Sequence, residues 1–492
     1  MKLETNTTIN FFKEIAKIPR ESGNEGKIAE YLCEFAKAKN LEYKKDKFNN
    51  VLIKKKNCNK VPIILQAHTD MVCEKENNKN FDFKSESIEV IEENGYLHAN
   101  GTTLGADNGI GIAQILTILN SDMEVNIEAI FTVSEETSMI GSINFDATKL
   151  KGKMLLNLDG FEENTILIES AGFYDIILKM DYRSNTKKEG NFDLYEISLT
   201  GLEGGHSGFD IDKNRGNSSI LLADILNNIK DIELVDFTGG TKFNVIPSNA
   251  KAVFYTNMRY NEMKELIKKY ENKLKNRFSN ISIEIKVLKN NNNNSEHYIQ
   301  EIENNINEHN INKDSNLNNT LISSLDIEQS KRFLQSICRF PHGVLNKNER
   351  GEVTTSINLG VVNLQENEIK VGMRSSRKEE EKNCLNKLKE YCNKNNFEFI
   401  ILGSQPSFRT SENAEIVKRL IEAHPTKLLG LKPTVKSMHI TVEVGFFQEK
   451  IPDIQIAIIS PNIRGAHTPK ECVEIASIER TNRWIENFLE NC

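Results

Sequence analysis

The sequence predicts an α/β domain that is interrupted by an inserted α+β domain. Strand-like and helix-like patterns alternate over residues 1–173. Residues 174–402 instead combine strands of alternating polarity with amphipathic helices. The α/β alternation returns over residues 403–492. The two outer segments are therefore predicted to fold together as one catalytic-type domain, and the middle segment as a second domain.

The first segment supports this prediction element by element. Short apolar runs that end in polar residues predict strands at residues 61–70, 126–136 and 153–160. Apolar residues three and four positions apart predict helices at residues 24–40 and 109–121. Strands that alternate with helices in this way are typical of an α/β sheet.

The middle segment has a different pattern. Alternation with a period of two predicts strands at residues 173–182, 194–202 and 249–260. Helical spacing predicts helices at residues 218–232 and 263–278. This mixture of elements predicts an α+β domain.

An Asn-rich stretch lies at about residues 290–320 and contains few large apolar side chains. Such a composition buries little apolar surface, so it predicts a surface excursion with weak or local structure. Beyond it, a helix at residues 412–424 and a strand at residues 453–460 restore the α/β pattern.

Charge and cysteine content limit the classes of function. The formal net charge is −7 and the pI is about 5.9, which argues against a nucleic-acid partner because phosphate binding needs a concentrated basic surface. The 8 cysteines form no CxxC pair, which indicates reduced thiols in a cytoplasmic protein. The N-terminus lacks the apolar core of a signal peptide, and no run of about 18 apolar residues occurs, so no membrane association is expected.

Candidate functional residues follow the predicted strands and occupy the Gly-rich loop before the helix at residues 109–121. Loops beyond the carboxyl ends of strands converge on one crevice in an α/β sheet. The acidic and imidazole residues in these positions are His68, Asp70, Asp107, Glu135, Glu136, Asp159 and His467. Their shared placement predicts a single site.

The residue types at this site favour a metal centre. Several carboxylates buried together without a cation would repel one another and lose their hydration. Mixed histidine and carboxylate ligands suit zinc, with manganese or cobalt as alternatives. These residues come from five separate chain segments, which can each deliver one ligand. Five ligands exceed one tetrahedral shell, so we expect a carboxylate that bridges two ions about 3.5–4 Å apart.

Neighbouring residues at the site are expected to have separate roles. Residues i and i+2 of an extended chain point to the same side, so Asp70 can bond the far nitrogen of His68. Adjacent residues point to opposite sides, so Glu136 can bind a metal while Glu135 faces the attacking water as general base. In the alternative, Asp70 only caps a turn, and the two glutamates are both ligands or one of them caps a helix.

Six ordered motifs resemble metallopeptidase family M20, and more narrowly its aminoacyl-histidine dipeptidase branch, also described as cytosolic non-specific dipeptidases. They span residues 65–475 and are LQAHTDMVCEK, GTTLGADNGIGIA, SEETSMIGS, LLNLDG, GLEGGHSGFDIDKNRGNS and RGAHTPKECVEI. The resemblance implies a catalytic domain like that of the dinuclear-metal aminopeptidases, with a mixed central sheet. It also implies that the inserted domain is a lid that carries dimer contacts.

The resemblance further implies the roles of the site residues. The implied ligands are His68 and Asp159 for one ion, Glu136 and His467 for the other, and Asp107 as the bridge. The family also places a cis peptide bond after the bridging residue, here Asp107–Asn108. By the same resemblance, Asp70 orients His68 and Glu135 is the general base.

Residues of the inserted domain and of the last segment match the family's oxyanion and substrate contacts. His206 in GLEGGHSGFD would stabilise the oxyanion, in its own subunit or across a dimer. The matching substrate contacts are Asn244, Arg374, His439, Glu443 and Gly445. An Arg such as Arg374 is a natural clamp for the terminal carboxylate of a peptide, although this residue and Asn244 are alternatively surface polar residues. Thr441 and Val442 depart from the family pattern, so the shape of the pocket is expected to differ from that of relatives.

The predicted function is that of a metal-dependent dipeptidase that hydrolyses Xaa-His and other dipeptides through a metal-bridging water activated by Glu135. The alternatives are an N-acyl amino-acid deacylase or another amide hydrolase on the same scaffold, and a non-catalytic binding protein. The expected partners are a small peptide substrate and a second copy of the chain in a homodimer, with no nucleic acid and no membrane.

Overall fold

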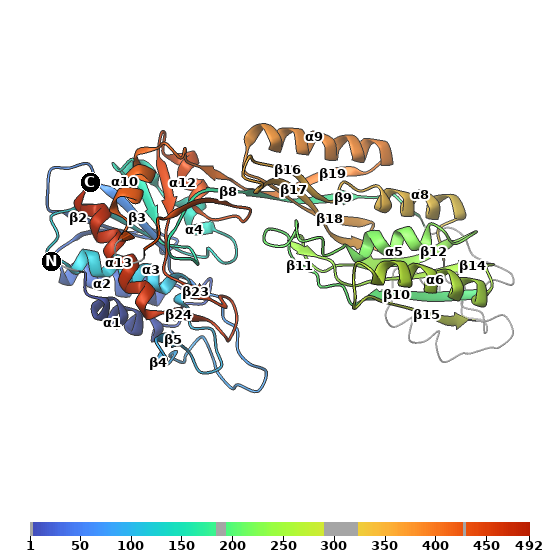
Figure 1. The fold of residues 1–492 in the computed structure, drawn as a ribbon, viewed down its shortest axis with the longest axis horizontal. Helices are drawn as coiled ribbons and strands as arrows, with labels where there is room; N and C mark the ends of the chain where they lie inside the picture. The colour runs from blue at the N-terminus through green and yellow to red at the C-terminus, as the bar shows by residue number, and fades with distance from the viewer. Residues whose placement is uncertain (1–2, 184–192, 290–322, 427–429) are drawn as a thin grey trace. The chain divides into compact units, whose positions relative to one another are not determined.

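The computed structural model describes residues 3–183, 193–289, 323–426 and 430–492. The chain divides into two compact units (Figure 1). Unit 1 comprises Met1–Ser170 and Gln405–Cys492, and unit 2 comprises Ala171–Ser404. The predicted boundaries after residues 173 and 402 lie close to these two crossings. The Asn-rich stretch at about residues 290–320 lies largely outside the described residues.

Unit 1 is built on a nine-stranded sheet of mixed direction. In spatial order its strands are β1 (Glu42–Lys45), β2 (Val51–Lys56), β6 (Asn126–Thr132), β3 (Ile63–His68), β7 (Met154–Asn157), β22 (Gln455–Ile458), β8 (Thr165–Ser170) and β20 (Phe408–Arg409), with β21 (Thr434–Met438) paired to β8. β3 runs parallel to both β6 and β7, whereas β2 runs antiparallel to β6. The predicted mixed central sheet is confirmed.

Helices supply apolar side chains to the two faces of this sheet. They are α1 (Thr5–Ala16), α2 (Gly26–Ala38), α3 (Ala106–Asn120), α4 (Ile140–Asn144), α10 (Glu415–Ala423), α12 (Val444–Lys450) and α13 (Ile475–Glu490), with a short 3-10 turn, η1 (Ala147–Lys149). Successive residues of β3 point to opposite faces. Ile63 and Leu65 join a core cluster with α1, α2, α3, α10 and α13, whereas Ile64 joins a second cluster with Phe447 of α12. All six residues of β3 are therefore buried.

A small four-stranded sheet also belongs to unit 1. Its order is β23 (Ile463–Arg464), β24 (Cys472–Glu474), β5 (Tyr96–His98) and β4 (Ile91–Glu93). The antiparallel pairing of β23 with β24 closes the loop 465–471, which carries His467. The sequence did not predict this sheet because strands of two or three residues are too short to show a period.

Unit 2 contains a second nine-stranded sheet. Its strands are, in order, β15 (Ser282–Lys289), β10 (Asp193–Thr200), β14 (Ala250–Thr256), β12 (Glu233–Gly239), β17 (Val353–Asn363), β18 (Glu368–Ser375), β9 (Gly172–Lys179) and β19 (Glu398–Gln405), with β16 (Gly343–Lys347) paired to β17. A separate pair joins β11 (Gly205–His206) to β13 (Val245–Ile246). The helices are α5 (Ser218–Leu226), α6 (Tyr260–Lys275), α8 (Ile327–Cys338) and α9 (Lys378–Asn395).

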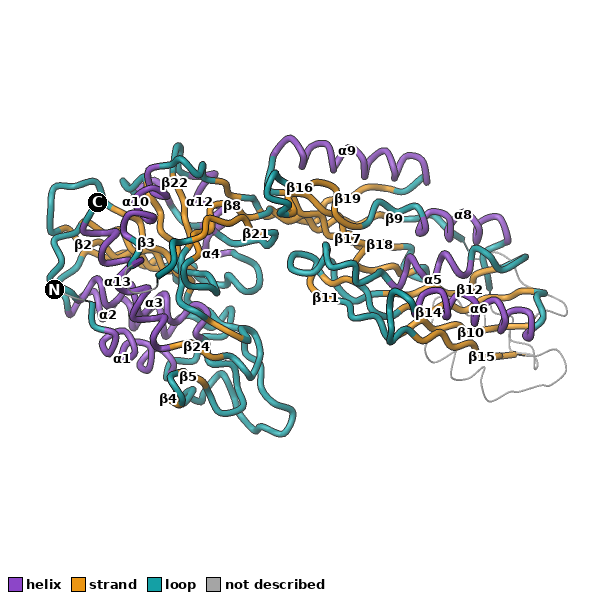
Figure 2. The backbone as a smooth tube through the Cα atoms, viewed as in Figure 1, coloured by secondary structure: helices purple, strands orange, loops and turns teal. Residues whose placement is uncertain are grey.

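The helices and the large sheet of unit 2 share one apolar core. Leu222 of α5, Phe333 of α8 and Leu388 of α9 pack in the same cluster as the buried residues of the strands. Figure 2 shows the strands and helices of each unit. The predicted combination of an α/β domain with an inserted α+β domain is thus confirmed. Within the described part of the chain, no helix is long and apolar enough to cross a membrane.

Candidate metal and catalytic site

Three neighbouring strands of unit 1 end at the same edge of the sheet. β3 lies between β6 and β7 and is parallel to both, with His68 opposite Thr132 and Gln66 opposite Asn157. The chain segments that follow β6 and β7 therefore begin beside His68. These segments carry the adjacent glutamates 135 and 136 and the aspartate 159.

Asp107 enters the site from the start of α3. Its Oδ1 lies 3.1 Å from His68 Nε2, and its Oδ2 lies 3.1 Å from His467 Nε2. The peptide bond from Asp107 to Asn108 is cis, as the resemblance implies. Each oxygen of one carboxylate thus faces a different histidine, which is the arrangement that a bridging ligand requires.

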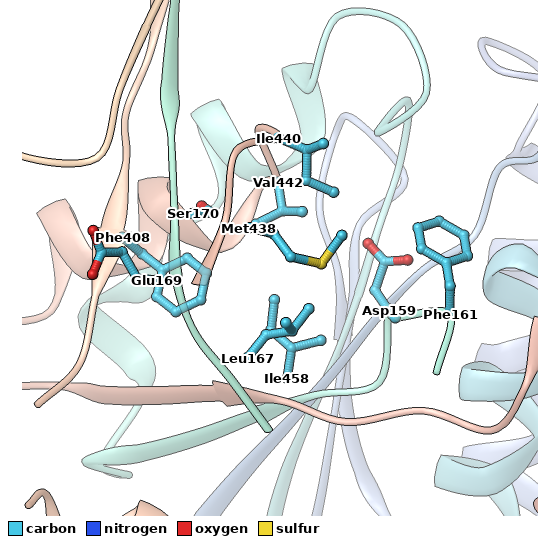
Figure 3. Close-up of a pocket in the computed structure, with 11 residues that line it drawn as sticks. Asp159, Phe161, Leu167, Glu169, Ser170, Phe408, Met438, Ile440, Val442 and Ile458 are labelled. Atoms are coloured by element: carbon cyan, nitrogen blue, oxygen red, sulfur yellow. The ribbon is translucent and has the colours of Figure 1, made fainter. Parts of the chain in front are cut away.

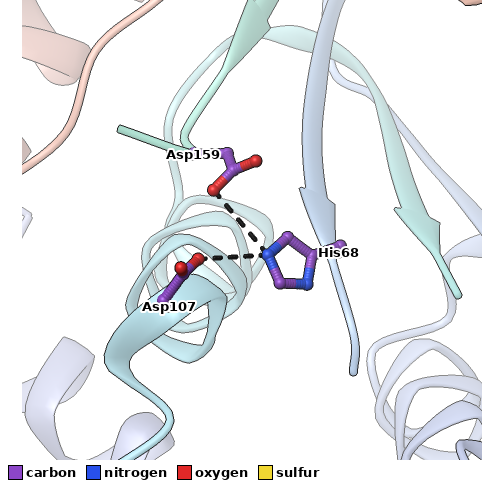
Figure 4. Close-up of side chains that lie close together, drawn as sticks. All are labelled: His68, Asp107 and Asp159. Carbon is purple, nitrogen blue, oxygen red and sulfur yellow. Dashed lines mark hydrogen bonds and ion pairs between the residues drawn. The ribbon is translucent and has the colours of Figure 1, made fainter. Parts of the chain in front are cut away.

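The remaining candidate ligands complete a group around each histidine. His68 Nε2 lies 3.7 Å from Asp159 Oδ1 (Figure 4), and His467 Nε2 lies 3.0 Å from Glu136 Oε1. The ligand atoms of His68, Asp107 and Asp159 all lie within 4.8 Å of one another, and so do those of Asp107, Glu136 and His467. The two groups share Asp107, and each holds a histidine and two carboxylates.

The charges at this site suit cations. Burial alone would raise the pKa of Asp107, but hydrogen bonds with His467 and His68 lower it below its ordinary value. Burial raises the pKa of Glu136 and of Asp159 above their ordinary values, because the charged carboxylates lose their hydration there. Divalent cations would offset this burial of negative charge, so the residues present fit a dinuclear metal centre.

Glu135 differs from its neighbour Glu136 in its surroundings. Its pKa is raised well above the ordinary value, first by burial and then by the negative charges of Asp159 and Glu136. Its carboxylate also comes within 4.8 Å of the ligand atoms of His68 and Glu136. A carboxyl group of raised pKa beside such a centre has the affinity for protons that a general base and acid needs.

Asp70 contacts both the histidine and the pair of glutamates. Its Oδ1 lies 3.3 Å from His68 Nδ1, the nitrogen that faces away from Asp107. The same Oδ1 accepts a hydrogen bond of 3.0 Å from the Glu135 backbone N–H, and its Oδ2 accepts one of 3.1 Å from that of Glu136. Asp70 thus lies between the imidazole and the turn that carries both glutamates.

Glu471 holds the loop that carries Asp107, and sequence analysis assigned it no role. Its buried carboxylate accepts hydrogen bonds from the backbone N–H groups of Leu104 (2.8 Å), Gly105 (2.8 Å) and Asp107 (3.1 Å). Glu471 stands in the motif RGAHTPKECVEI, four positions after His467. Its position in this motif was the available sign that Glu471 belongs to the site. The sequence does not indicate its partner, because an acidic residue in a loop has no periodicity.

A small apolar cavity lies beside Asp159 (Figure 3). The side chains of Phe161, Met438, Ile440 and Val442 line it, and its volume is about 10 Å³. That is at most the space of one water molecule, so no substrate side chain fits it in this structure. Val442, which departs from the family pattern, is therefore a wall of this cavity.

Glu443 and Gly445, two of the predicted substrate contacts, pack inside unit 1. Glu443 is 0% exposed, and its Oε1 accepts hydrogen bonds of 2.6 Å from both Gln66 Nε2 and Thr132 Oγ1. Burial raises the pKa of Glu443 to about 7. A Cβ atom at residue 445 would lie 2.3 Å from the carbonyl oxygen of Pro406, so packing alone requires this glycine. These residues support β3, β6 and α12 from inside the unit, and their contact with substrate stays a prediction.

His439 lies on the same segment and is 8% exposed. Its contact with substrate stays a prediction.

Unit 2 brings three predicted residues together. Arg374 Nη2 lies 3.4 Å from His206 Nε2, and Arg374 Nε donates a hydrogen bond of 3.3 Å to Ser207 Oγ. The Ser207 backbone N–H in turn donates to the carbonyl oxygen of Asn244 (2.8 Å). The Arg374 guanidinium also lies 4.4 Å from the ring centre of Phe173. Burial lowers the pKa of Arg374 to about 10, which still leaves it protonated at neutral pH.

Comparison with known proteins gives consistent matches over almost the whole chain. The model of peptidase family M20/M25/M40 matches residues 64–491. The cytosol non-specific dipeptidase of Escherichia coli (strain K12) is 29% identical over 486 residues, which cover 95% of this chain and 94% of that protein.

Solved structures match as well. The crystal structure of aminoacylhistidine dipeptidase from Vibrio alginolyticus has a TM-score of 0.81 at 27% identity and covers 99% of this chain and 98% of its own. Aminopeptidase PepT from Bacillus cereus ATCC 10987 shares the fold, with a TM-score of 0.54 at 14% identity and coverage of 99% of this chain and 98% of its own.

Proposed function

The chain belongs to peptidase family M20/M25/M40 and is a metal-dependent dipeptidase, and we propose that it hydrolyses Xaa-His as well as other dipeptides at the site of unit 1. The observation that carries this proposal is the position of Asp107 between His68 and His467, with one carboxylate oxygen toward each. That arrangement supports a centre for two ions, which amide hydrolysis at neutral pH can use.

The proposed metals are two divalent ions, with zinc as the first choice and manganese or cobalt as alternatives. The residues that would hold them are His68, Asp107 and Asp159 for one ion, and Asp107, Glu136 and His467 for the other. When bound, such ions polarise the peptide carbonyl and lower the pKa of water.

Glu135 is the proposed general base and acid. It accepts a proton from the attacking water and then donates it to the nitrogen of the leaving amino acid. Two features support this role: its raised pKa, and its position beside His68 and Glu136. Asp70 holds the backbone N–H groups of residues 135 and 136, so the base is kept in place throughout the reaction.

Asp70 also sets the tautomer of His68. Because its carboxylate faces Nδ1, the proton of the neutral imidazole is held on that nitrogen. Nε2, which faces Asp107 and Asp159, then presents its lone pair for metal binding. A histidine held in this way is also a stronger ligand.

The cluster in unit 2 is proposed to bind the negative parts of the substrate. Arg374 pairs with the terminal carboxylate of the dipeptide, and His206 donates to the oxyanion that forms on the peptide carbonyl. The proximity of Arg374 to His206 and its link through Ser207 to Asn244 support a joint role. His439 is proposed as a further substrate contact.

The proposed working form is a cytoplasmic homodimer that assembles through the inserted domain and engages neither nucleic acid nor membrane. The net charge of −7 supports the lack of a nucleic-acid partner, and the cytosolic relative from Escherichia coli supports the cytoplasmic location.

A panel of substrates tests the proposed function. Metal-free protein is assayed on Xaa-His dipeptides, other dipeptides, tripeptides and N-acetyl amino acids, before and after addition of zinc, manganese or cobalt. We expect metal-dependent cleavage of dipeptides. Preference for the N-acetyl compounds would instead assign the site to a deacylase, and no turnover with any metal would overturn the proposal.

A further inference from the structure

Arg20 connects two of the loops at the site from inside unit 1. It follows α1 and is only 1% exposed. Its Nη1 donates to the carbonyl oxygens of Thr69 (3.0 Å) and Asp70 (2.9 Å), and its Nη2 donates to that of Gly105. One side chain therefore ties the backbone after β3 to the backbone before α3.

Two glycines of the segment GADNG, which begins α3, leave room for this arginine. A Cβ atom at Gly105 would lie 2.5 Å from Arg20 Nη2, and one at Gly109 would lie 2.8 Å from the same atom. Gly105 also has a φ of 70°, a conformation that side chains disfavour. The Gly-rich character of this segment thus follows in part from the buried guanidinium.

Ser22 extends the same connection to Asp70. Its Oγ donates a hydrogen bond of 2.7 Å to Asp70 Oδ2, the oxygen that also accepts from the Glu136 backbone N–H. The backbone of Glu21 pairs with that of Met71 in a parallel bridge. The residues after Arg20 therefore run alongside the residues after β3 and fix the Asp70 carboxylate.

Glu25 holds the turn of the two glutamates from its other end. It is 3% exposed, and its Oε1 accepts hydrogen bonds of 2.9 Å from both the backbone N–H and the Oγ of Ser134. Ser134 immediately precedes Glu135 and has a φ of 55°. This left-handed conformation is disfavoured for a residue with a side chain, so it needs such support.

We propose that residues 20–25, RESGNE, form a positioning clamp that fixes the turn 134–136 and thereby the general base Glu135. Ser22 acts through Asp70 on one side of the turn, and Glu25 acts on Ser134 on the other. The clamp lies before residues 64–491, which the family model matches. Its effect on turnover rests on the proposed dipeptidase function, whereas its effect on the order of the turn does not.

The test compares Glu25→Ala, Glu25→Gln and Ser22→Ala with Glu30→Gln, an exposed residue of α2 that serves as the control. Hydrogen–deuterium exchange of the segment 133–139 in the metal-free protein reports the order of the turn. Turnover of a dipeptide and metal content are measured on the metal-loaded protein. The Gln variant keeps an acceptor oxygen for Ser134, so it separates the hydrogen bonds from the charge.

We expect Glu25→Ala to speed exchange in the segment 133–139 and, at full metal loading, to lower kcat about 10- to 100-fold with KM unchanged. Glu25→Gln restores most of the protection and of the rate, and Ser22→Ala gives a smaller effect in the same direction. Glu30→Gln behaves as the wild type.

Wild-type exchange and wild-type kcat in Glu25→Ala would overturn the clamp, and so would equal losses in Glu25→Gln and Glu25→Ala. If Glu25→Ala does not fold, Ser22→Ala decides: unchanged exchange of the segment 133–139 in Ser22→Ala contradicts the proposal. A wild-type protein that cleaves no dipeptide would overturn the proposed function, while the exchange data would still judge the clamp.

Discussion

Oδ1 of Asp107 lies 3.1 Å from Nε2 of His68. The other oxygen of the same carboxylate faces His467, so Asp107 is common to both groups of candidate ligands. Loss of this side chain is therefore expected to affect both ions.

The first prediction concerns Asp107→Ala. The protein should lose most of its metal, from about two ions per chain to fewer than one, because each remaining group keeps only two ligands. Metal analysis after gel filtration measures this content. Asp146→Ala removes an exposed carboxylate of the same unit and should retain the metal. Full metal content in Asp107→Ala would contradict the bridging role.

Glu443 gives a prediction about stability and pH. Its pKa is raised from an ordinary 4.5 to about 7 by burial, so the folded state binds this proton more tightly than the unfolded state. The stabilisation is complete below pH 4.5 and is lost as pH rises through 7. In the metal-free protein, the free energy of unfolding should therefore fall more steeply between these pH values in the wild type than in Glu443→Gln.

A second variant, Glu443→Leu, removes the acceptor that Gln66 and Thr132 share. We expect it to lower the free energy of unfolding by about 1–3 kcal/mol relative to Glu443→Gln in urea denaturation. Identical pH profiles in the wild type and Glu443→Gln would show that the carboxyl group does not titrate as described.

Gly445 provides a prediction about packing. In Gly445→Ala the added Cβ would meet the Pro406 carbonyl oxygen at 2.3 Å, so the variant should lose about 1–3 kcal/mol of stability. Gly403→Ala is the matched control, because a Cβ there meets nothing within 4 Å. Thermal and urea unfolding compare the two. Equal stability of both variants would contradict the close packing of Gly445 against Pro406.

Arg374 tests the binding of the terminal carboxylate. Arg374→Lys should lose part of the bidentate pairing and raise KM for dipeptides about 10- to 100-fold, equivalent to ~1.5–3 kcal/mol. Dipeptide amides lack the carboxylate, so their KM should change little. Steady-state kinetics on matched dipeptides and dipeptide amides measures both KM values. A similar rise in KM for both would argue against a carboxylate clamp.

The sequence predicted the parts of this site that depend on short-range pattern. The apolar runs before His68, Glu135 and Asp159 predicted strands, and the shared carboxyl edge of a parallel sheet predicted their convergence. The structure brings the five predicted ligands into two overlapping groups. The placement of His68, Glu135 and Asp159 at strand ends could therefore be predicted without knowledge of the packing.

Other residues were beyond prediction because long-range packing decides their roles. Glu443 accepts hydrogen bonds from Gln66 of β3 and Thr132 of β6, which lie more than three hundred residues away in the sequence. Glu25 meets Ser134 across more than one hundred residues of sequence. Such contacts leave no period or spacing in the sequence, so only the folded structure reveals them.

The division of labour between Glu135 and Glu136 is the central claim, and the metal content and kcat of Glu135→Gln measured together test it most directly. The account predicts about two ions per chain, as in the wild type, with kcat lowered about 10²- to 10⁴-fold. Glu136→Gln, measured in parallel, should lose metal as well as turnover. A Glu135→Gln variant that keeps near-wild-type kcat, or that loses metal as Glu136→Gln does, would contradict the account.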